Sequence, residues 1–266
     1  MRSLPCALAI GGLDPGGGAG ILADARAISR AGAFACAVAA VLTTQSTSGL
    51  REAVAVDARR VIAQAACVMK HQRVRAIKVG ALGSAANARA VADLLAIHRD
   101  VPVVCDPVML PTRGRARLLD ERAVGLMRTR LLPRSTVVIA NAPEAEVLTR
   151  RRVTRLSEAR DAARAIVGMG ARAALVKGGH LGGRDAVDVL AMGDEVLELR
   201  AIRLRLPALH GGGCVLSSLV AGRLAVDERD LADGTIGDAA RWAKRIHHAA
   251  LARAVAVGGD MRVLDP

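Results

Sequence analysis

Aromatic side chains are almost absent from this chain of 266 residues, where Phe34 and Trp242 are the only two. Proteins that hold single-stranded nucleic acid stack its bases on aromatic rings, so the scarcity argues against that partner. The 38 Lys and Arg residues outnumber the 25 Asp and Glu residues, which gives a formal charge of +13. Because the arginines are scattered along every segment, we interpret the excess as a solvated surface that attracts anionic ligands, and we expect no nucleic-acid partner.

Cysteine pairs and membrane segments are missing as well. The five cysteines are widely spaced, with no Cys-x-x-Cys pair, so we expect free thiols in a reducing compartment. The most apolar stretch, residues 31–42, is shorter than the roughly 20 residues that span a bilayer. The N-terminus lacks the layout of a signal peptide. The sequence therefore predicts a cytoplasmic protein with no membrane contact.

Small aliphatic residues make up for the missing aromatics, within a hydrophobic fraction of 52%. They suit parallel strands that helices cover on both faces. The expected strands are 6–10, 35–41, 75–79, 101–105, 136–140 and 173–176, followed by a hairpin of 186–192 and 195–199. The expected helices are 21–31, 57–70, 85–97, 121–131, 143–148, 157–168, 211–224 and 236–257. This alternation predicts an α/β fold with right-handed crossovers, and the lack of a linker predicts a single domain, 1–266.

Five segments of glycine or polar residues stand out, and four of them directly follow expected strands, where open α/β sheets bind their ligands. The first segment, residues 11–20, fits neither the dinucleotide fingerprint nor the P-loop, and it is either a ligand-facing loop or a flexible turn. Asp106 would face Mg²⁺ or phosphate, or start an ordinary turn. Asn141 either caps the next helix or joins Glu144 in holding Mg²⁺-bound water beside a nucleotide phosphate.

Lysine is rare in this chain, which has only four. Lys177 follows an expected strand and precedes two glycines, a place where a compact ammonium would serve as a point charge for phosphate. Lys78 lies between Ile77 and Val79 and could instead be the partner of a buried carboxylate.

The turn Gly211-Gly212-Gly213-Cys214 opens an expected helix. Its free backbone N–H groups and the helix dipole would form an anion hole for a transferred phosphoryl group. Cys214 stands at the helix N-terminus, where a thiol pKa is commonly lowered, and could act as a base toward a substrate hydroxyl. The motif alone fits a helix start with an inert, packed cysteine equally well.

Seven segments, in order and at matching spacing, resemble the hydroxymethylpyrimidine/phosphomethylpyrimidine kinases of thiamine biosynthesis, in the ribokinase-like superfamily. They are Gly12-Leu-Asp-Pro-Gly-Gly-Gly-Ala-Gly-Ile-Leu-Ala-Asp24, Leu42-Thr-Thr-Gln45, Ile77-Lys-Val-Gly80, Asp106-Pro-Val-Met109, Asn141-Ala-Pro-Glu144, Val176-Lys-Gly-Gly-His180 and His210-Gly-Gly-Gly-Cys-Val-Leu-Ser-Ser218. The resemblance implies a three-layer α/β/α sandwich with a mainly parallel central sheet. It also implies ATP and Mg²⁺ as cofactors, a pyrimidine substrate and a homodimer.

The resemblance assigns roles by position. The pyrimidine pocket would be formed by Gly12, Asp24, Gln45 and Val108. The nucleotide would contact Asn141, Lys177 and Gly179, and the metal would lie on the side of Asp106 and Glu144. The anion hole would be Gly211, Gly212 and Gly213, with Cys214 and Lys177 as catalytic residues.

Three departures from the family's pattern bear on activity. Gly212 stands where the family has Thr, and Gly80-Ala81-Leu82 replaces Gly-Met-Leu. The expected lid, residues 110–117, is unusually basic, so Arg113 or Arg115 could meet nucleotide phosphates. The alternatives are therefore a pyridoxal kinase of the Cys-loop class or a catalytically impaired pyrimidine-binding homologue.

Overall fold

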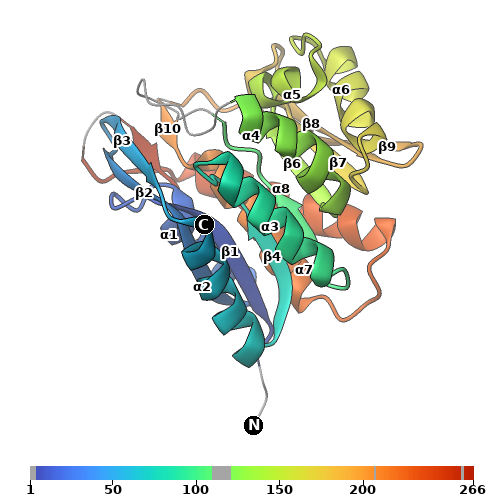
Figure 1. The fold of residues 1–266 in the computed structure, drawn as a ribbon. Helices are drawn as coiled ribbons and strands as arrows, with labels where there is room; N and C mark the ends of the chain where they lie inside the picture. The colour runs from blue at the N-terminus through green and yellow to red at the C-terminus, as the bar shows by residue number, and fades with distance from the viewer. Residues whose placement is uncertain (1–3, 110–120, 207, 259–260) are drawn as a thin grey trace.

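The computed structural model describes residues 4–109, 121–206, 208–258 and 261–266. Its centre is a nine-stranded sheet in the order β3-β2-β1-β4-β5-β6-β7-β8-β9 (Figure 1). The strands are β1 (Cys6–Leu13), β2 (Phe34–Ser46), β3 (Gly49–Ala55), β4 (Val74–Val79), β5 (Val103–Cys105), β6 (Val137–Asn141), β7 (Ala173–Lys177), β8 (Asp185–Met192) and β9 (Glu195–Ile202). The strands from β2 to β7 in this order run parallel, whereas β3, β8 and β9 pair antiparallel with their neighbours. The prediction of a mainly parallel sheet is confirmed.

Helices cover both faces of this sheet (Figure 1). One face packs against α1 (Gly20–Arg30), α7 (Gly212–Val226) and α8 (Asp233–Ala252). The other packs against α2 (Ala58–His71), α3 (Ala85–Ile97), α4 (Glu121–Leu126), α5 (Ala142–Thr149) and α6 (Leu156–Gly168). Short helical turns η1 (Met127–Leu131), η2 (Leu132–Arg134) and η3 (Gly178–His180) complete the set. The result is the three-layer α/β/α sandwich.

Strand β1 shows why small residues suffice for this core. Ala7 and Ala9 belong to the apolar cluster under α1 and α7, whereas Leu8 and Ile10 belong to the cluster on the opposite face. Successive side chains of a strand point to opposite faces, so an unbroken apolar run fills both clusters at once. All four residues are fully buried.

The parallel strands end at one common edge of the sheet. Val79 at the end of β4 pairs with Cys105 at the end of β5, and Asn141 at the end of β6 pairs with Lys177 at the end of β7. The polar residues that follow these strands are therefore neighbours in space although they are far apart in the sequence.

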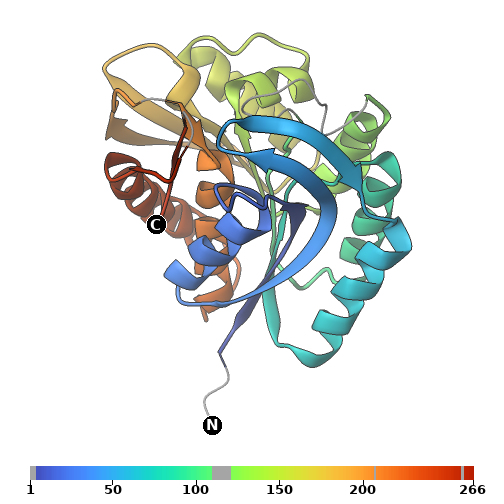
Figure 2. The same ribbon diagram turned by 90° about the vertical axis from the view of Figure 1, so that its left-hand side faces the viewer.

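Several elements differ from the sequence prediction: β2 runs to Ser46 instead of ending at residue 41, and the expected helix 121–131 is α4 followed by η1. The last helix ends at Ala252, and Val255–Ala256 forms β11 of a small sheet with β10 (Leu209–His210) and β12 (Arg262–Val263). Strand β3 was not expected; its hairpin with the curved β2 is visible in Figure 2. Strands β3 and β11 are mostly exposed edge strands, so neither carries the apolar run that marks a central strand. Within the described residues, no helix is long and apolar enough to cross a membrane.

Candidate functional site

A cavity of about 670 Å³ lies at the edge where the parallel strands end. It is lined by residues from the first glycine loop, the ends of the central strands and the start of α7. Every site residue expected from the sequence lines it: Gly12, Asp24, Gln45, Asp106, Val108, Asn141, Glu144, Lys177, Gly179, Gly211, Gly212, Gly213 and Cys214. The fold thus gathers in one place groups that span two hundred positions of the chain.

The start of α7 leaves its backbone donors free of side-chain caps. Gly211 at the N-cap has a positive φ of 78°, and no side chain accepts from the first turn. A Cβ atom at Gly213 would lie 2.7 Å from Lys177 Nζ and 4.0 Å from Asp106 Oδ1. The turn therefore faces the ammonium and a carboxylate at close range, and only glycine leaves that space open.

The β6–α5 junction holds Glu144 in a capping box. Asn141 Oδ1 accepts from Glu144 N at 2.8 Å, and Glu144 Oε2 accepts from Asn141 N at 2.8 Å. The capping alternative for Asn141 is therefore present in the structure. Burial raises the pKa of the Glu144 carboxyl to about 7, although Lys177 opposes the shift. Burial disfavours the Lys177 ammonium, but Glu144 and then Asp106 outweigh it and raise its pKa.

Lys78 is the centre of a buried charge cluster beneath the cavity. Its Nζ donates to both carboxylate oxygens of Asp24 at 2.9 Å and lies 3.8 Å from Asp106 Oδ2. Ser218 Oγ donates to Asp24 Oδ1 at 2.8 Å, and Ser217 Oγ donates to Asp106 Oδ2 at 3.1 Å. Lys78 is thus the partner of a buried carboxylate, the alternative that its apolar neighbours indicated.

The thiol of Cys214 differs from the sequence expectation. Burial raises its pKa to about 12, and Lys78 only partly opposes the shift. The expected lowering at a helix N-terminus is therefore wrong for the unliganded protein. The reason is that the half-buried Cys214 in the first turn of α7 faces Asp106 and Asp24, so that desolvation and these two charges disfavour a thiolate.

The first glycine loop and the α7 turn are packed against each other. His210 Nε2 lies 2.8 Å from Asp14 Oδ2, and the Asp14 carboxylate also accepts from the backbone N–H of Gly16 and of Ala19. A Cβ atom at Gly211 would stand 2.0 Å from the carbonyl oxygen of Gly18. The loop is consequently a fixed wall of the cavity and not a flexible turn.

The remaining predicted positions surround the same space. Gln45 and Val108 line the cavity from β2 and from the segment after β5, and a Cβ atom at Gly12 would lie 3.8 Å from that of Ala81. Asp24 is fully buried, with its oxygens occupied by Lys78 and Ser218. The expected lid and its Arg113 and Arg115 lie outside the described residues.

Sequence reasoning missed a second group of polar residues, which lies beside Gly178 and Gly179. Lys244 Nζ donates to Asp188 Oδ2 at 2.7 Å, and Asp188 Oδ1 accepts from Gly178 N at 2.8 Å. The Arg203 guanidinium donates to the carbonyl oxygens of Gly178, Gly179, Gly183 and Asp185, at 2.8 to 3.1 Å. The rarity of lysine could have drawn attention to Lys244, but no local motif marks Asp188 or Arg203.

A metal ion would have to share its ligands with a substrate. In the described part of the chain, no group of three or more His, Cys, Asp and Glu side chains is arranged to hold one. Mg²⁺, however, is commonly held by one or two carboxylates together with substrate phosphates. Asp106 and Glu144 both line the cavity and fit that requirement, since carboxylate oxygens are the protein ligands that Mg²⁺ takes.

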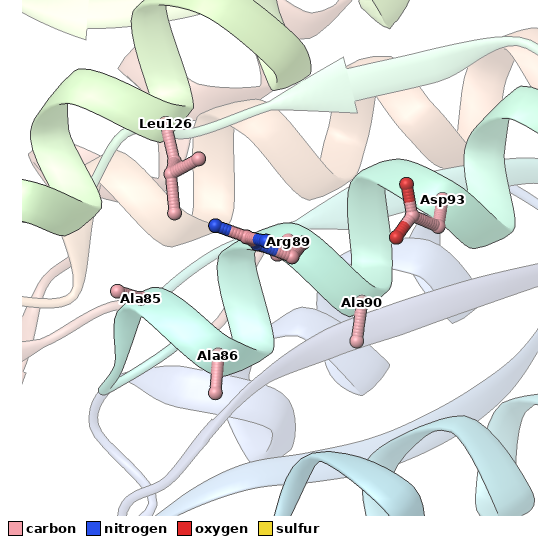
Figure 3. Close-up of a pocket in the computed structure, with 6 residues that line it drawn as sticks. All are labelled: Ala85, Ala86, Arg89, Ala90, Asp93 and Leu126. Carbon is pink, nitrogen blue, oxygen red and sulfur yellow. The ribbon is translucent and has the colours of Figure 1, made fainter.

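A second hollow lies on the outer surface between α3 and α4 (Figure 3). Its walls are Ala85, Ala86, Arg89, Ala90, Asp93 and Leu126. Alanines form half of this set, and Asp93 pairs with Arg130 at 2.7 Å. The hollow offers no convergent polar groups comparable to those at the strand ends.

Comparison with known proteins gives one family. The family model described as phosphomethylpyrimidine kinase matches residues 14–264. The hydroxymethylpyrimidine/phosphomethylpyrimidine kinase of Streptomyces coelicolor is 40% identical over 261 residues, which cover 98% of this chain and 94% of that protein.

Solved structures of two kinds share the fold. A phosphomethylpyrimidine kinase from Clostridium difficile has a TM-score of 0.78 at 27% identity, covering 92% of this chain and 99% of the other. An ADP complex of Bacillus subtilis pyridoxal kinase has a TM-score of 0.87 at 26% identity, covering 98% and 97%. The ribokinase-like architecture expected from the sequence is confirmed.

Proposed function

Because the chain belongs to the phosphomethylpyrimidine kinase family, we propose that it transfers the γ-phosphoryl group of ATP to 4-amino-5-hydroxymethyl-2-methylpyrimidine, to its monophosphate, or to both. The observation that carries this proposal is the α7 start, which has no side-chain cap and faces Lys177 and Asp106 in the cavity. Backbone donors, an ammonium and carboxylates in one enclosed site suit a phosphoryl transfer, which depends mainly on positioning and charge stabilisation.

The nucleotide would occupy the end of the cavity formed by Asn141, Lys177 and Gly179. Lys177 would meet the transferred phosphoryl group, while the N–H groups of residues 211–213 receive its equatorial oxygens. Asp106 and Glu144 would hold Mg²⁺, which neutralises phosphate charge when it is bound. Deprotonated Glu144 is the form that binds a cation, so metal binding should release a proton below about pH 7.

The pyrimidine would lie against Gly12, Gln45 and Val108, at the end of the cavity below β2. Asp24 is buried beneath this end and accepts hydrogen bonds from Lys78. We therefore propose that Asp24 orients the Lys78 ammonium, in addition to any contact that it makes with the pyrimidine ring. Gln45 offers both an amide donor and a carbonyl acceptor to a heterocycle.

Transfer to the alcohol forms a bond between the hydroxymethyl oxygen and the γ-phosphorus and breaks the bond to the β–γ bridging oxygen. The hydroxyl proton must also leave, and we propose that Cys214, which lines the cavity, receives it as a thiolate. Its raised pKa makes that thiolate scarce in the unliganded protein, so the rate would depend on the charge of Lys78, which favours the ionised thiol. Transfer to the monophosphate needs no such base, because its phosphate oxygens are already ionised.

The test is a coupled assay of ADP production with hydroxymethylpyrimidine, its monophosphate and pyridoxal, each with ATP and Mg²⁺. ADP formation that depends on either pyrimidine supports the proposal. If no ADP forms with any of the three acceptors, the chain is a binding homologue without kinase activity, the alternative that Gly212 and Ala81 left open.

Pyridoxal kinase is the second candidate, and the likeness to the Bacillus subtilis enzyme favours it. Both acceptors are aromatic heterocycles that carry a hydroxymethyl group. A larger kcat/KM for pyridoxal than for hydroxymethylpyrimidine in the same assay would select this function.

We further propose a homodimer in the cytoplasm. The five cysteines are free thiols, and four of them are buried or half-buried, as suits a reducing compartment. Light scattering of the purified protein at two concentrations tests the dimer, because a monomer would give a mass near 27.5 kDa.

A further inference from the structure

His247 lines the cavity from α8, yet none of the proposed steps uses it. Its Nε2 lies 2.9 Å from the carbonyl oxygen of Gly212. A carbonyl oxygen can only accept, so Nε2 carries the hydrogen and donates it. The bond links the last long helix to the first residue of α7.

The imidazole is not suited to carrying protons in the reaction. Burial lowers the pKa of His247 to about 4, although Asp188 opposes the shift; Lys244 and Lys177, the other charged groups that face it, lower the pKa further. The ring is therefore neutral near pH 7, and its single N–H is fixed on Nε2 by the bond to Gly212.

The position of this bond matters because a peptide group is planar. The carbonyl of Gly212 and the N–H of Gly213 belong to the same trans peptide unit and point in opposite directions. Holding the oxygen on the His247 side therefore fixes the direction of the Gly213 N–H on the other side. Gly213 lines the cavity, and a Cβ atom built on it would lie 2.7 Å from Lys177 Nζ, so this peptide borders the reacting centre.

Gly212 has no side chain that could fix this peptide by itself. A Cβ atom there would meet only Leu264 Cδ1 at 3.8 Å and His247 Nε2 at 3.9 Å, both ordinary contacts. Three successive glycines have more backbone freedom than any other tripeptide. The Gly212 carbonyl also accepts within α7, as the first residue of a helix does, and His247 adds a second contact from outside the helix.

We infer that His247 is a positioning residue for phosphoryl transfer: it fixes the Gly212–Gly213 peptide so that the Gly213 N–H points at the transferred phosphoryl group. The inference rests on the proposed kinase function, and it adds a residue of α8 to the site. It also explains how the chain tolerates glycine at position 212, where the resembling kinases carry Thr.

The test compares His247→Leu with His248→Leu. His248 is the next residue of α8 and makes a similar bond, from Nε2 to the carbonyl oxygen of Ile202 at 2.9 Å, but it does not line the cavity. We expect His247→Leu to lower kcat about tenfold, the equivalent of one ordinary hydrogen bond, with the KM for the acceptor little changed. His248→Leu should keep the wild-type kcat. His247→Gln, which keeps a donor, should retain more activity than His247→Leu.

A binding measurement separates this inference from the choice of acceptor. ADP with aluminium fluoride mimics the transferred phosphoryl group, whereas ADP alone does not. His247→Leu should bind the fluoride complex about tenfold more weakly and bind ADP as the wild type does. The double variant His247→Leu/Gly212→Ala should recover part of the lost affinity for ADP–aluminium fluoride, because alanine restricts the backbone freedom of the turn.

Two results would overturn the inference. One is equal binding of ADP–aluminium fluoride by the wild type and His247→Leu. The other is an equal loss of kcat in the His247 and His248 variants, which would indicate a general effect on α8. If no ADP forms with either pyrimidine, the proposed substrate is rejected. The binding of ADP–aluminium fluoride by the wild type and by His247→Leu would then still test the role of His247.

Discussion

At the scale of single residues, two of the groups in the site whose pKa is shifted lead to predictions of pH behaviour. The thiol of Cys214 has a pKa raised to about 12, and the carboxyl of Glu144 has one raised to about 7. Burial is the main cause in both cases, and it disfavours the charged form. The two residues nevertheless lead to different experiments.

Cys214→Ala should distinguish the two acceptors. If the thiolate takes the hydroxyl proton, kcat for the alcohol should fall by about 10²–10⁴, while transfer to the monophosphate changes much less. Lys177→Ala should slow transfer to both, because both involve the same phosphoryl group. Comparable losses with both acceptors for Cys214→Ala would indicate a structural role for the cysteine.

The pH profile gives an independent check on Cys214. Below its pKa the thiol is mostly protonated, and the thiolate fraction rises about tenfold per pH unit. The wild-type kcat/KM for the alcohol should therefore still be rising at pH 9, and the Ala variant should lack that rise. A wild-type profile that is level above pH 7 would remove the thiolate from the mechanism.

Glu144→Gln should change how stability depends on pH. A carboxyl whose folded pKa lies above its unfolded value binds more protons in the folded state, so its stabilisation is lost as pH rises from about 4.5 to 7. The wild type should thus lose up to about 3 kcal/mol of unfolding free energy over that range relative to Glu144→Gln. Urea denaturation at pH 5 and pH 8 measures this.

Glu158 is the matched control, because it also accepts backbone hydrogen bonds at a helix start but is exposed to solvent. Hydrogen bonds from Thr154 lower its pKa to about 2. The stabilisation that Glu158 contributes is therefore lost as pH falls, whereas that of Glu144 is lost as pH rises. If Glu144→Gln and the wild type change in parallel from pH 5 to pH 8, Glu144 is not protonated in the folded protein.

At the scale of elements, the start of α7 decides the shape of the site. Gly211 and Gly212 are adjacent, but their surroundings differ. Gly211 has a φ of 78°, and a Cβ there would lie 2.0 Å from the Gly18 carbonyl oxygen, whereas a Cβ at Gly212 would make only contacts of 3.8 Å or more. The first glycine is required by geometry, and the second is not.

Gly211→Ala should therefore lower the unfolding free energy by about 2 kcal/mol or more, from the strained φ and the displaced first loop. Gly212→Ala should be neutral or stabilise by up to about 1 kcal/mol. Chemical denaturation of the two variants side by side tests this. Equal stabilities would mean that the first loop moves away freely from the turn.

At the scale of the whole molecule, one buried ion pair connects four elements. Asp24 comes from α1, Lys78 from β4 and Ser218 from α7, and Asp106 follows β5 at 3.8 Å. Burial disfavours the Lys78 ammonium, but the Asp24 carboxylate outweighs it and raises the pKa of Lys78. The cation is therefore retained beneath the cavity at neutral pH.

Lys78→Met should cost about 3–5 kcal/mol of unfolding free energy, because it leaves two buried carboxylates without their cation. Lys70 on α2 is exposed, and Lys70→Met should stay within about 0.5 kcal/mol of the wild type. Thermal and urea unfolding provide the comparison. A stability loss for Lys78→Met no greater than that for Lys70→Met would show that Asp24 and Asp106 are neutral when buried.

Local signals in the sequence predicted those helices and strands that have a clear apolar pattern and glycine or polar residues at their ends. The glycines at residues 211–213 and the apolar run of β1 fixed those elements independently of the rest of the chain. Strand β3 and the residues of β11 escaped prediction because both are exposed edge strands without an apolar run, although β3 pairs with its sequence neighbour β2. Asp188, Arg203 and His247 escaped for a different reason, since each bonds to a backbone group of another segment that the fold brings near.

The sequence by itself determined the chemistry that the chain can offer: rare lysines at strand ends, carboxylates after strands, and a glycine turn that opens a helix. These features are local and depend only on neighbouring residues. Tertiary structure alone decided how they act. It paired the Lys78 ammonium with the Asp24 carboxylate, and it raised the pKa of the Cys214 thiol by desolvation. It also brought His247 Nε2 within hydrogen-bond distance of the Gly212 carbonyl oxygen. Desolvation and distance are properties of the packed molecule, so no pattern in the sequence could reveal them.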